Sequence, residues 1–247
     1  MSGHNKWSSI KHKKGAADAK RAKIFTKLIK EITVAAKQGG GSVETNPRLR
    51  AAVTSAKSSN MPMNNIEKAI KKGTGELEGV SYEEVVYEGF GPAGISIIVD
   101  TLTDNKKRTV AEIRHIFSKY NGNLAENGAV SWNYETKGFI EVETDESEDD
   151  FMIKAIDAGA EDINRQDDIF EVLTDPKDLH IVMSSFEKDG YKILNAELIK
   201  KAKNTVNADD VAEKLLNLIE KIEECDDVQK VYSNFVISNE RFNELTK

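Results

Sequence analysis

Residues 138–174, GFIEVETDESEDDFMIKAIDAGAEDINRQDDIFEVLT, contain the pattern that decides the fold class. The segment GFIEVE (138–143) has the composition of a strand. Residues 147–158 favour a helix, because their first turn is filled with acidic side chains that complement the helix dipole. The segments EDINR and IFEVLT flank QDD and predict a hairpin. The order of these elements is therefore strand, helix, strand, strand.

One more helix and one more strand complete this unit. Residues 176–188 favour a helix, and YKILNAELI (191–199) favours a strand. The full order is βαββαβ, which is typical of the ferredoxin-like split unit.

The segments before and after this unit complement each other. Before it, the strands EEVVYE and ISIIVDTL, a helix over residues 109–120 and a strand AVSWNYE (129–135) give the order ββαβ. A closing helix and strand occur only after it, at 209–224 and 228–237. This split indicates that the ferredoxin-like unit is inserted into another domain.

The first part of the chain favours helices. From Ala17 to Lys37, apolar residues recur at i, i+4 and i+8, and the segment GGGS (39–42) ends that helix. Asn46 and Pro47 are typical of a helix start. A short third helix includes Ile66 and Ile70, and we expect it to end at Gly73.

These patterns predict an α+β protein with an N-terminal three-helix domain followed by two α/β sandwich-type domains. The last of these, ferredoxin-like and βαββαβ in order, is inserted into the other. The predicted boundaries are 1–79 for the helical domain and its linker, 80–136 and 205–247 for the discontinuous domain, and 137–204 for the insertion.

Charge is divided unevenly along the chain. The formal net charge of the 247 residues is −7, yet the residues up to Lys72 hold thirteen lysines and three arginines against four acidic residues, a net +12. The remainder must then carry −19. A split of this size indicates a basic head that faces a polyanion and an acidic body. The alternative interpretation is that the lysines serve only to make these helices soluble.

Two groups of basic residues are candidates for nucleic-acid binding. On a helix, Lys20, Lys23, Lys27 and Lys30 fall within about 80° of one another, opposite the apolar stripe, which predicts an outward-facing lysine ridge. The second group lies at the start of the 109–120 helix, where basic side chains and free amides predict a phosphate-facing loop, with a solvated turn as the alternative. The candidates are Lys6, Lys11, Lys13, Lys14, Lys20, Arg21, Lys23, Lys27, Lys30, Lys106, Lys107 and Arg108.

The patterns of catalysis and cofactor binding are weak. GFGPAG (89–94) matches G-x-G-x-x-G, but a strand follows it, whereas a dinucleotide site requires a helix there. The four histidines lack H-E-x-x-H spacing, and Cys225 follows two glutamates that disfavour a thiolate. We therefore expect a protein that is not an enzyme, with no cofactor and no small-molecule substrate.

Metal and membrane sites are not predicted either. Ser2-Gly3-His4 is a set that suits Cu(II) or Ni(II) once Met1 is removed, but a terminal tail is the simpler interpretation. The cluster DESEDD (145–150) is accounted for by the dipole of the helix that it opens. A single cysteine and the lack of a long apolar run favour a cytoplasmic protein without a membrane partner.

Four segments resemble the YebC/PmpR family. They are GHNKWSSIKHKKGAADAKRAKIFTKLIKEI, NPRLRAAVTSAKSSNMPMNNIEKAIKKGTGE, YEGFGPAGISIIVDTLTDNKKRT and GAVSWNYETKG, which together cover most of residues 3–138. The resemblance implies a three-domain α/β protein with a helical head. It also implies a cytoplasmic probable transcriptional regulator that binds DNA, although a mitochondrial branch activates translation of cytochrome c oxidase and bacterial relatives are linked to ribosomes.

The expected partner is therefore DNA or ribosomal RNA. The head has only three arginines, and lysine acts as a point charge, which favours contact with the phosphate backbone over base reading. This composition favours a ribosome-associated factor slightly over a sequence-specific DNA-binding regulator. The alternative from another class is a protein-interaction module whose exposed sheet edge pairs with a partner strand.

Overall fold

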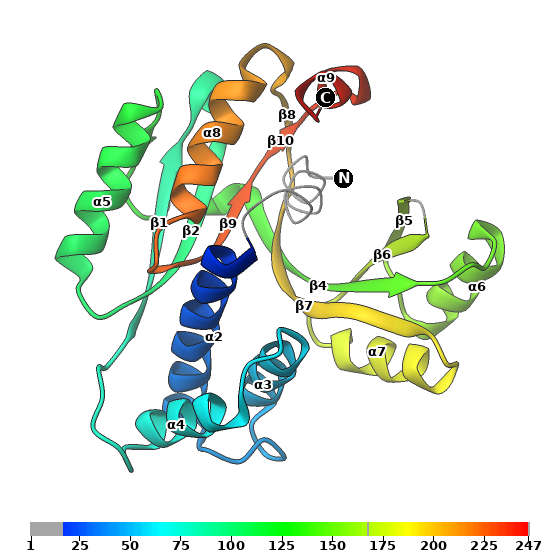
Figure 1. Ribbon diagram of the computed structural model, residues 1–247. Coiled ribbons are helices and arrows are strands. Elements are labelled where there is room, and N and C mark those ends of the chain that lie inside the picture. Colours follow the sequence, from blue (N-terminus) through cyan, green and yellow to red (C-terminus); the bar gives the residue numbers. More distant parts are fainter. Residues whose placement is uncertain (1–16, 167, 247) are drawn as a thin grey trace. The chain divides into compact units, whose positions relative to one another are not determined.

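The computed structural model describes residues 17–166 and 168–246 and shows a mixed helix and sheet protein (Figure 1). The α+β fold class is confirmed. The chain divides into two compact units. One unit consists of Asn133–Asn204, and the other contains the described residues up to Trp132 and from Thr205 onward.

The head contains the three helices α2 (Ala17–Gly39), α3 (Pro47–Ser58) and α4 (Met63–Thr74). The Asn46 side chain caps α3 by accepting a hydrogen bond of 3.0 Å from the backbone N–H of Leu49, and Pro47 occupies the first turn, as predicted. Both α3 and α4 pack on α2 around a core of their own. That core consists of Ile32, Ala35, Ala36, Leu49, Ala52, Val53, Ala56, Met61, Ile66 and Ala69.

The prediction that Gly73 ends the third helix is wrong. Helix α4 continues past it to Thr74 and is followed by Gly75, whose φ of 83° is in the left-handed region that favours glycine. A Cβ atom at Gly73 would lie 2.4 Å from the carbonyl oxygen of Thr33 and 2.7 Å from the Cβ of Ala36. Gly73 therefore permits close packing of α4 on α2.

The rest of this unit is built on an antiparallel sheet of order β3-β1-β2-β9. Its strands are β1 (Glu83–Phe90), β2 (Ser96–Thr103), β3 (Asn123–Leu124) and β9 (Val228–Ser233). The helices α5 (Lys106–Lys119) and α8 (Ala212–Glu223) contribute Ile113, Phe117 and a row of leucine and isoleucine residues to the core on this sheet (Figure 1). Strand β9, from the end of the chain, completes the sheet by pairing with β2.

Several predicted elements differ from the observed ones. The strand expected over residues 129–135 is wrong, because a 3-10 helix, η2 (Ser131–Asn133), precedes a long strand that begins at Tyr134. The strand expected over residues 228–237 is interrupted at Asn234, whose side chain accepts a hydrogen bond from the N–H of Ser96. The elements that were not expected as such are η1 (Pro92–Gly94), β3, β8 (Val206–Asn207), η3 (Asp209–Val211), β10 (Phe235–Val236) and α9 (Asn239–Thr246).

The second unit has the βαββαβ order of a ferredoxin-like domain. Its elements are β4 (Tyr134–Glu143), α6 (Glu148–Ala158), β5 (Asp162–Gln166), β6 (Ile169–Thr174), α7 (Leu179–Lys188) and β7 (Lys192–Ala202). The strand order is β5-β6-β4-β7, all antiparallel. Three phenylalanines form the centre of the core, with the ring of Phe151 lying 4.3 Å from that of Phe170 and 5.6 Å from that of Phe186.

Candidate nucleic-acid interface

Three lysines of α2, Lys23, Lys27 and Lys30, point toward the end of α8 and the residues that follow it. The ammonium groups of Lys23 and Lys27 donate hydrogen bonds to the carbonyl oxygens of Glu224 (3.1 Å) and Glu223 (3.0 Å). Lys30 donates in the same way to the carbonyl oxygen of Asp226, at 2.8 Å. The last carbonyl groups of a helix lack partners within the helix and form the negative end of its dipole. Lys23 and Lys27 therefore cap the C-terminal end of α8, and Lys30 binds the segment that follows the helix.

Lys30 also forms a buried ion pair. Its ammonium nitrogen lies 2.6 Å from Oδ1 of Asp227, and the side chains are only 8% and 4% exposed. The prediction of an outward-facing ridge is therefore wrong for Lys30, because helical periodicity gives the direction of a side chain but not the neighbour that it meets.

Asp227 joins the head to the start of α5. Its Oδ2 accepts hydrogen bonds from Thr109 (2.6 Å), Arg108 (2.7 Å) and Thr103 (3.2 Å). Burial by itself raises the pKa of Asp227, but the hydrogen bonds from Lys30, Thr109 and Arg108 outweigh it and lower the pKa to about 2. Asp227 is thus a charged residue held by four donors.

The predicted phosphate-facing loop has partners of its own. Lys106 pairs with Glu83 at 2.6 Å, and Arg108 pairs with Asp104 as well as with Asp227. The side chain of Asn105 caps α5 by accepting a hydrogen bond from the N–H of Arg108. Lys107 is exposed and forms no ion pair with the described part of the chain. Phosphate binding at this loop stays a prediction.

The remaining candidate contacts lie mostly outside the described residues. Lys6, Lys11, Lys13 and Lys14 lie outside the described residues, and for Lys20 only the backbone, in α2, is described. Arg21 is exposed, its guanidinium carbon lies 5.4 Å from the centre of the Phe25 ring, and it donates to the carbonyl oxygen of Asn60 at 3.4 Å.

The structure reveals exposed lysines that were not among the candidate contacts predicted from the sequence. Lys57 lies in the last turn of α3, and Lys68 and Lys71 lie on the outer face of α4. Within the described residues, the ammonium groups of these three lysines form neither ion pairs nor hydrogen bonds. The helical spacing of Lys68 and Lys71, opposite Ile66 and Ala69, was the signal in the sequence that could have identified this face.

A hollow of about 280 Å³ lies between α2, α5 and α8. Its lining includes Lys23, Lys119, Glu224 and Cys225, so charges of both signs are mixed in it. Burial, together with the nearby carboxylate of Glu112, raises the pKa of the Cys225 thiol to about 12, which makes this residue a poor nucleophile.

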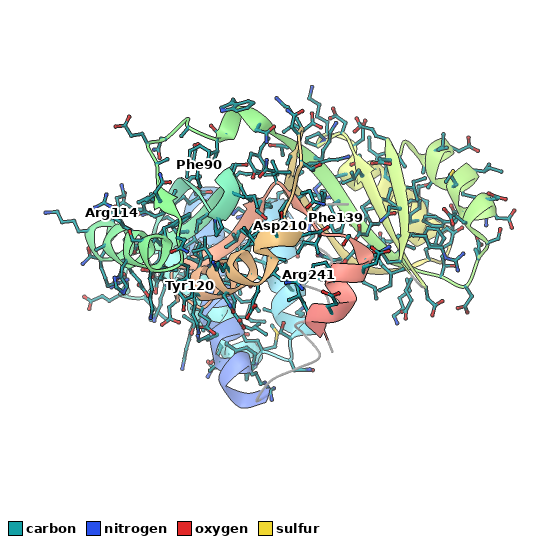
Figure 2. All side chains as sticks on the ribbon, turned by 90° about the horizontal axis from the view of Figure 1, so that it is seen from above. Phe90, Arg114, Tyr120, Phe139, Asp210 and Arg241 are labelled. Carbon is teal, nitrogen blue, oxygen red and sulfur yellow. The ribbon has the colours of Figure 1, made fainter. Side chains whose placement is uncertain are left out.

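Arg114 points away from the sheet on the exposed side of α5 (Figure 2).

Among the residues that the structure describes, no cluster of three or more His, Cys, Asp or Glu side chains is arranged to hold a metal ion. The described helices also include none that is both long and apolar enough to cross a bilayer.

Comparisons with known proteins identify the family. The family model "TACO1/YebC protein N-terminal domain" matches residues 5–76, and "TACO1/YebC second and third domain" matches residues 82–235. A probable transcriptional regulatory protein of Desulfosudis oleivorans is 56% identical over 97% of this chain and 98% of its own length. A protein of the same name from Thermotoga maritima is 54% identical over 99% of this chain and 98% of its own length.

A solved structure is also similar. The crystal structure of a conserved hypothetical protein from Aquifex aeolicus, 46% identical in sequence, superposes with a TM-score of 0.83 over 91% of this chain and 93% of that one. These matches confirm the resemblance inferred from the sequence motifs. The chain therefore belongs to the TACO1/YebC family.

Proposed function

We propose that this protein is a non-enzymatic, nucleic-acid-binding regulator of gene expression that acts in the cytoplasm and uses its head as the contact surface. The observation that carries the proposal is the charge division, +12 up to Lys72 and −19 beyond it. A basic region attracts phosphate over a Debye length of about 8 to 10 Å, while the acidic remainder repels it. The names of the relatives, probable transcriptional regulatory proteins, support a role in gene expression.

The proposed contacts are a revised set of the residues expected from the sequence. Lys30 is left out because it is buried on Asp227, and we assign it a structural role. Arg108 is engaged by two carboxylates and is likewise left out. The retained contacts are Lys6, Lys11, Lys13, Lys14, Lys20, Arg21, Lys23, Lys27, Lys106 and Lys107.

The physiological target is DNA or ribosomal RNA, and the binding experiment uses both. Labelled DNA duplex and ribosomal RNA fragments are titrated with the full chain between 50 and 200 mM salt, and fluorescence anisotropy reports binding. The logarithm of the affinity should fall with the logarithm of the salt concentration, with a slope of about −0.9 per phosphate contact on duplex DNA. An absence of binding to both would overturn the proposal and favour a protein-interaction module.

A sedimentation experiment distinguishes the two targets in the cell. Lysate containing the tagged protein is run on a sucrose gradient at low and at high salt. Migration with ribosomal particles that is lost at high salt supports a role in translation. A protein that stays at the top of the gradient but binds DNA in the titration supports a role in transcription.

A further inference from the structure

We infer that α3 and α4 form a helix–turn–helix unit and that α4 enters the major groove of duplex DNA. The inference rests on the proposed function and assigns it a surface that the charge division does not identify. Both helices pack on α2 and are joined by the four residues 59–62 (Figure 1). A connection of this length is typical of helix–turn–helix units.

The turn between the two helices is well defined. Asn60 has a φ of 58°, in the left-handed region that asparagine tolerates. The N–H of Met61 donates to the carbonyl oxygen of Ala56 and that of Asn60 to the carbonyl oxygen of Lys57, both at 2.9 Å. Met61 is buried in the core of the head, as expected for the residue after such a cap. The turn therefore fixes where α4 begins relative to α3.

The two faces of α4 differ sharply in chemistry. Ile66 and Ala69 are each 1% exposed and pack into the head. The opposite face is exposed along its length and follows the i, i+3, i+4, i+7 spacing of a single helical stripe. The residues of this stripe are Asn64, Glu67, Lys68 and Lys71.

The chemistry of this stripe fits a DNA duplex. Asn64 is the second residue of α4, and in helix–turn–helix proteins the first residues of the second helix contact base edges. An asparagine side chain can form a bidentate pair with adenine, while lysines such as Lys68 and Lys71 neutralise phosphates. The major groove of B-form DNA admits an α-helix, whereas that of A-form RNA is too deep and narrow to be read.

The lysines of the α2 ridge already form hydrogen bonds within the protein. Lys23 and Lys27 contact the end of α8 and Lys30 the residues after it, so their hydrogen bonds have to be exchanged before they can bind phosphate. The ammonium groups of Lys68 and Lys71 have no such partner within the described residues. The lysines of α4 are therefore more accessible to a phosphate than those of the α2 ridge.

The test compares two double variants of the full chain. Lys68→Gln/Lys71→Gln removes two charges from α4, and the matched control Lys177→Gln/Lys188→Gln removes two exposed charges from the other unit. Each protein is titrated into a duplex DNA of mixed sequence and into an RNA duplex of the same sequence. On DNA, we expect the α4 variant to bind more weakly than the wild type. The slope of the logarithm of its affinity against the logarithm of the salt concentration should be shallower by about 1.8. The control variant should match the wild type.

A third variant tests base reading. A DNA sequence is first selected from a random duplex pool with the wild-type protein. Asn64→Ala should then bind the selected duplex on the order of tenfold more weakly, while its affinity for unselected DNA changes little. Equal loss on both duplexes would overturn base reading by Asn64. Unchanged thermal transitions of all variants show that they fold.

The outcomes separate this inference from the proposed function. If the wild type binds neither DNA nor RNA, the proposed function fails. If the wild type binds DNA and the α4 variant binds it with the same affinity and salt slope, the inference is wrong and the proposed function stands. If the α4 variant loses the same factor of affinity for the DNA duplex as for the RNA duplex, the major-groove assignment is wrong.

Discussion

Lys30 shows how a single residue acquires a different role from the one its neighbours predict. It belongs to a run of lysines, yet its ammonium group lies against Asp227 and both side chains are buried. Removing one partner of a buried pair is costly, because the remaining charge loses its counter-ion without regaining water. The other three donors to Asp227 moderate that cost here.

We predict that Lys30→Met lowers the free energy of unfolding by about 2–3 kcal/mol, since Asp227 keeps its other donors. Chemical denaturation measures this change. Lys57→Met, at an exposed position without an ion pair, is the matched control and should stay within about 0.5 kcal/mol of the wild type. Equal stability of the two variants would show that the buried pair contributes nothing.

A second residue-scale effect depends on pH. Glu171 on β6 lies directly opposite Glu141 on β4. Burial and the charge of Glu141 raise the pKa of Glu171 to about 7, above its ordinary value of 4.5. The folded state therefore holds a proton that the unfolded chain releases, so stability declines as pH rises from about 4.5 to 7.

Glu171→Gln removes this dependence. We expect the variant to match the wild type at pH 5 and to exceed it at pH 8 by on the order of 1–2 kcal/mol. Calorimetric scans at the two pH values measure the difference. Glu187→Gln, at an exposed position of the same unit, serves as the control. A gain that is the same at both pH values would contradict ionisation of Glu171 as the cause.

At the scale of elements, the packing of α4 on α2 depends on a missing side chain. Gly73 lies where a Cβ atom would meet the backbone of Thr33 at 2.4 Å, a contact that requires the helices to move apart. Because backbone atoms cannot rotate out of the way, the cost falls on the whole helix pair and its core.

We predict that Gly73→Ala destabilises the head by about 1–3 kcal/mol, although alanine is the better helix former. Thermal unfolding followed by circular dichroism tests this. Lys72→Ala, at the exposed neighbouring position of α4, introduces an alanine without a new helix contact and should be close to neutral. A Gly73→Ala variant that is more stable than the wild type would mean that propensity outweighs the contact.

At the scale of the whole molecule, the two ends of the ferredoxin-like unit lie side by side. The carbonyl oxygen of Asn133 accepts a hydrogen bond from the N–H of Lys203 at 2.7 Å, and its side chain accepts one from the N–H of Asn204 at 3.1 Å. A segment whose ends adjoin can be removed without stretching the chain that surrounds it.

We therefore predict that replacing residues 133–204 by a short glycine linker leaves the pairing of β2 with β9 intact. Near-ultraviolet dichroism reports whether the remaining unit is folded. A molten product, with secondary structure but without a near-ultraviolet signal, would contradict the predicted insertion.

The sequence by itself determined the elements with strong periodicity. The capped start of α3, the βαββαβ order and the uneven charge all depend on residues close together in the chain. Local physics decides such features, because helix caps, turns and strand alternation involve neighbours within a few positions. Two predictions from local patterns were wrong, at Gly73 and over residues 129–135, because packing or a turn overrides propensity there.

Only the tertiary structure decided which charges are available. Lys23, Lys30 and Lys68 look alike in the sequence, yet the first caps α8, the second is buried on Asp227, and the third lies on an exposed helix face. The partners of the first two are about 200 positions further along the chain. Periodicity fixes the direction of a side chain on its own helix, but the group that it meets is set by how distant segments pack.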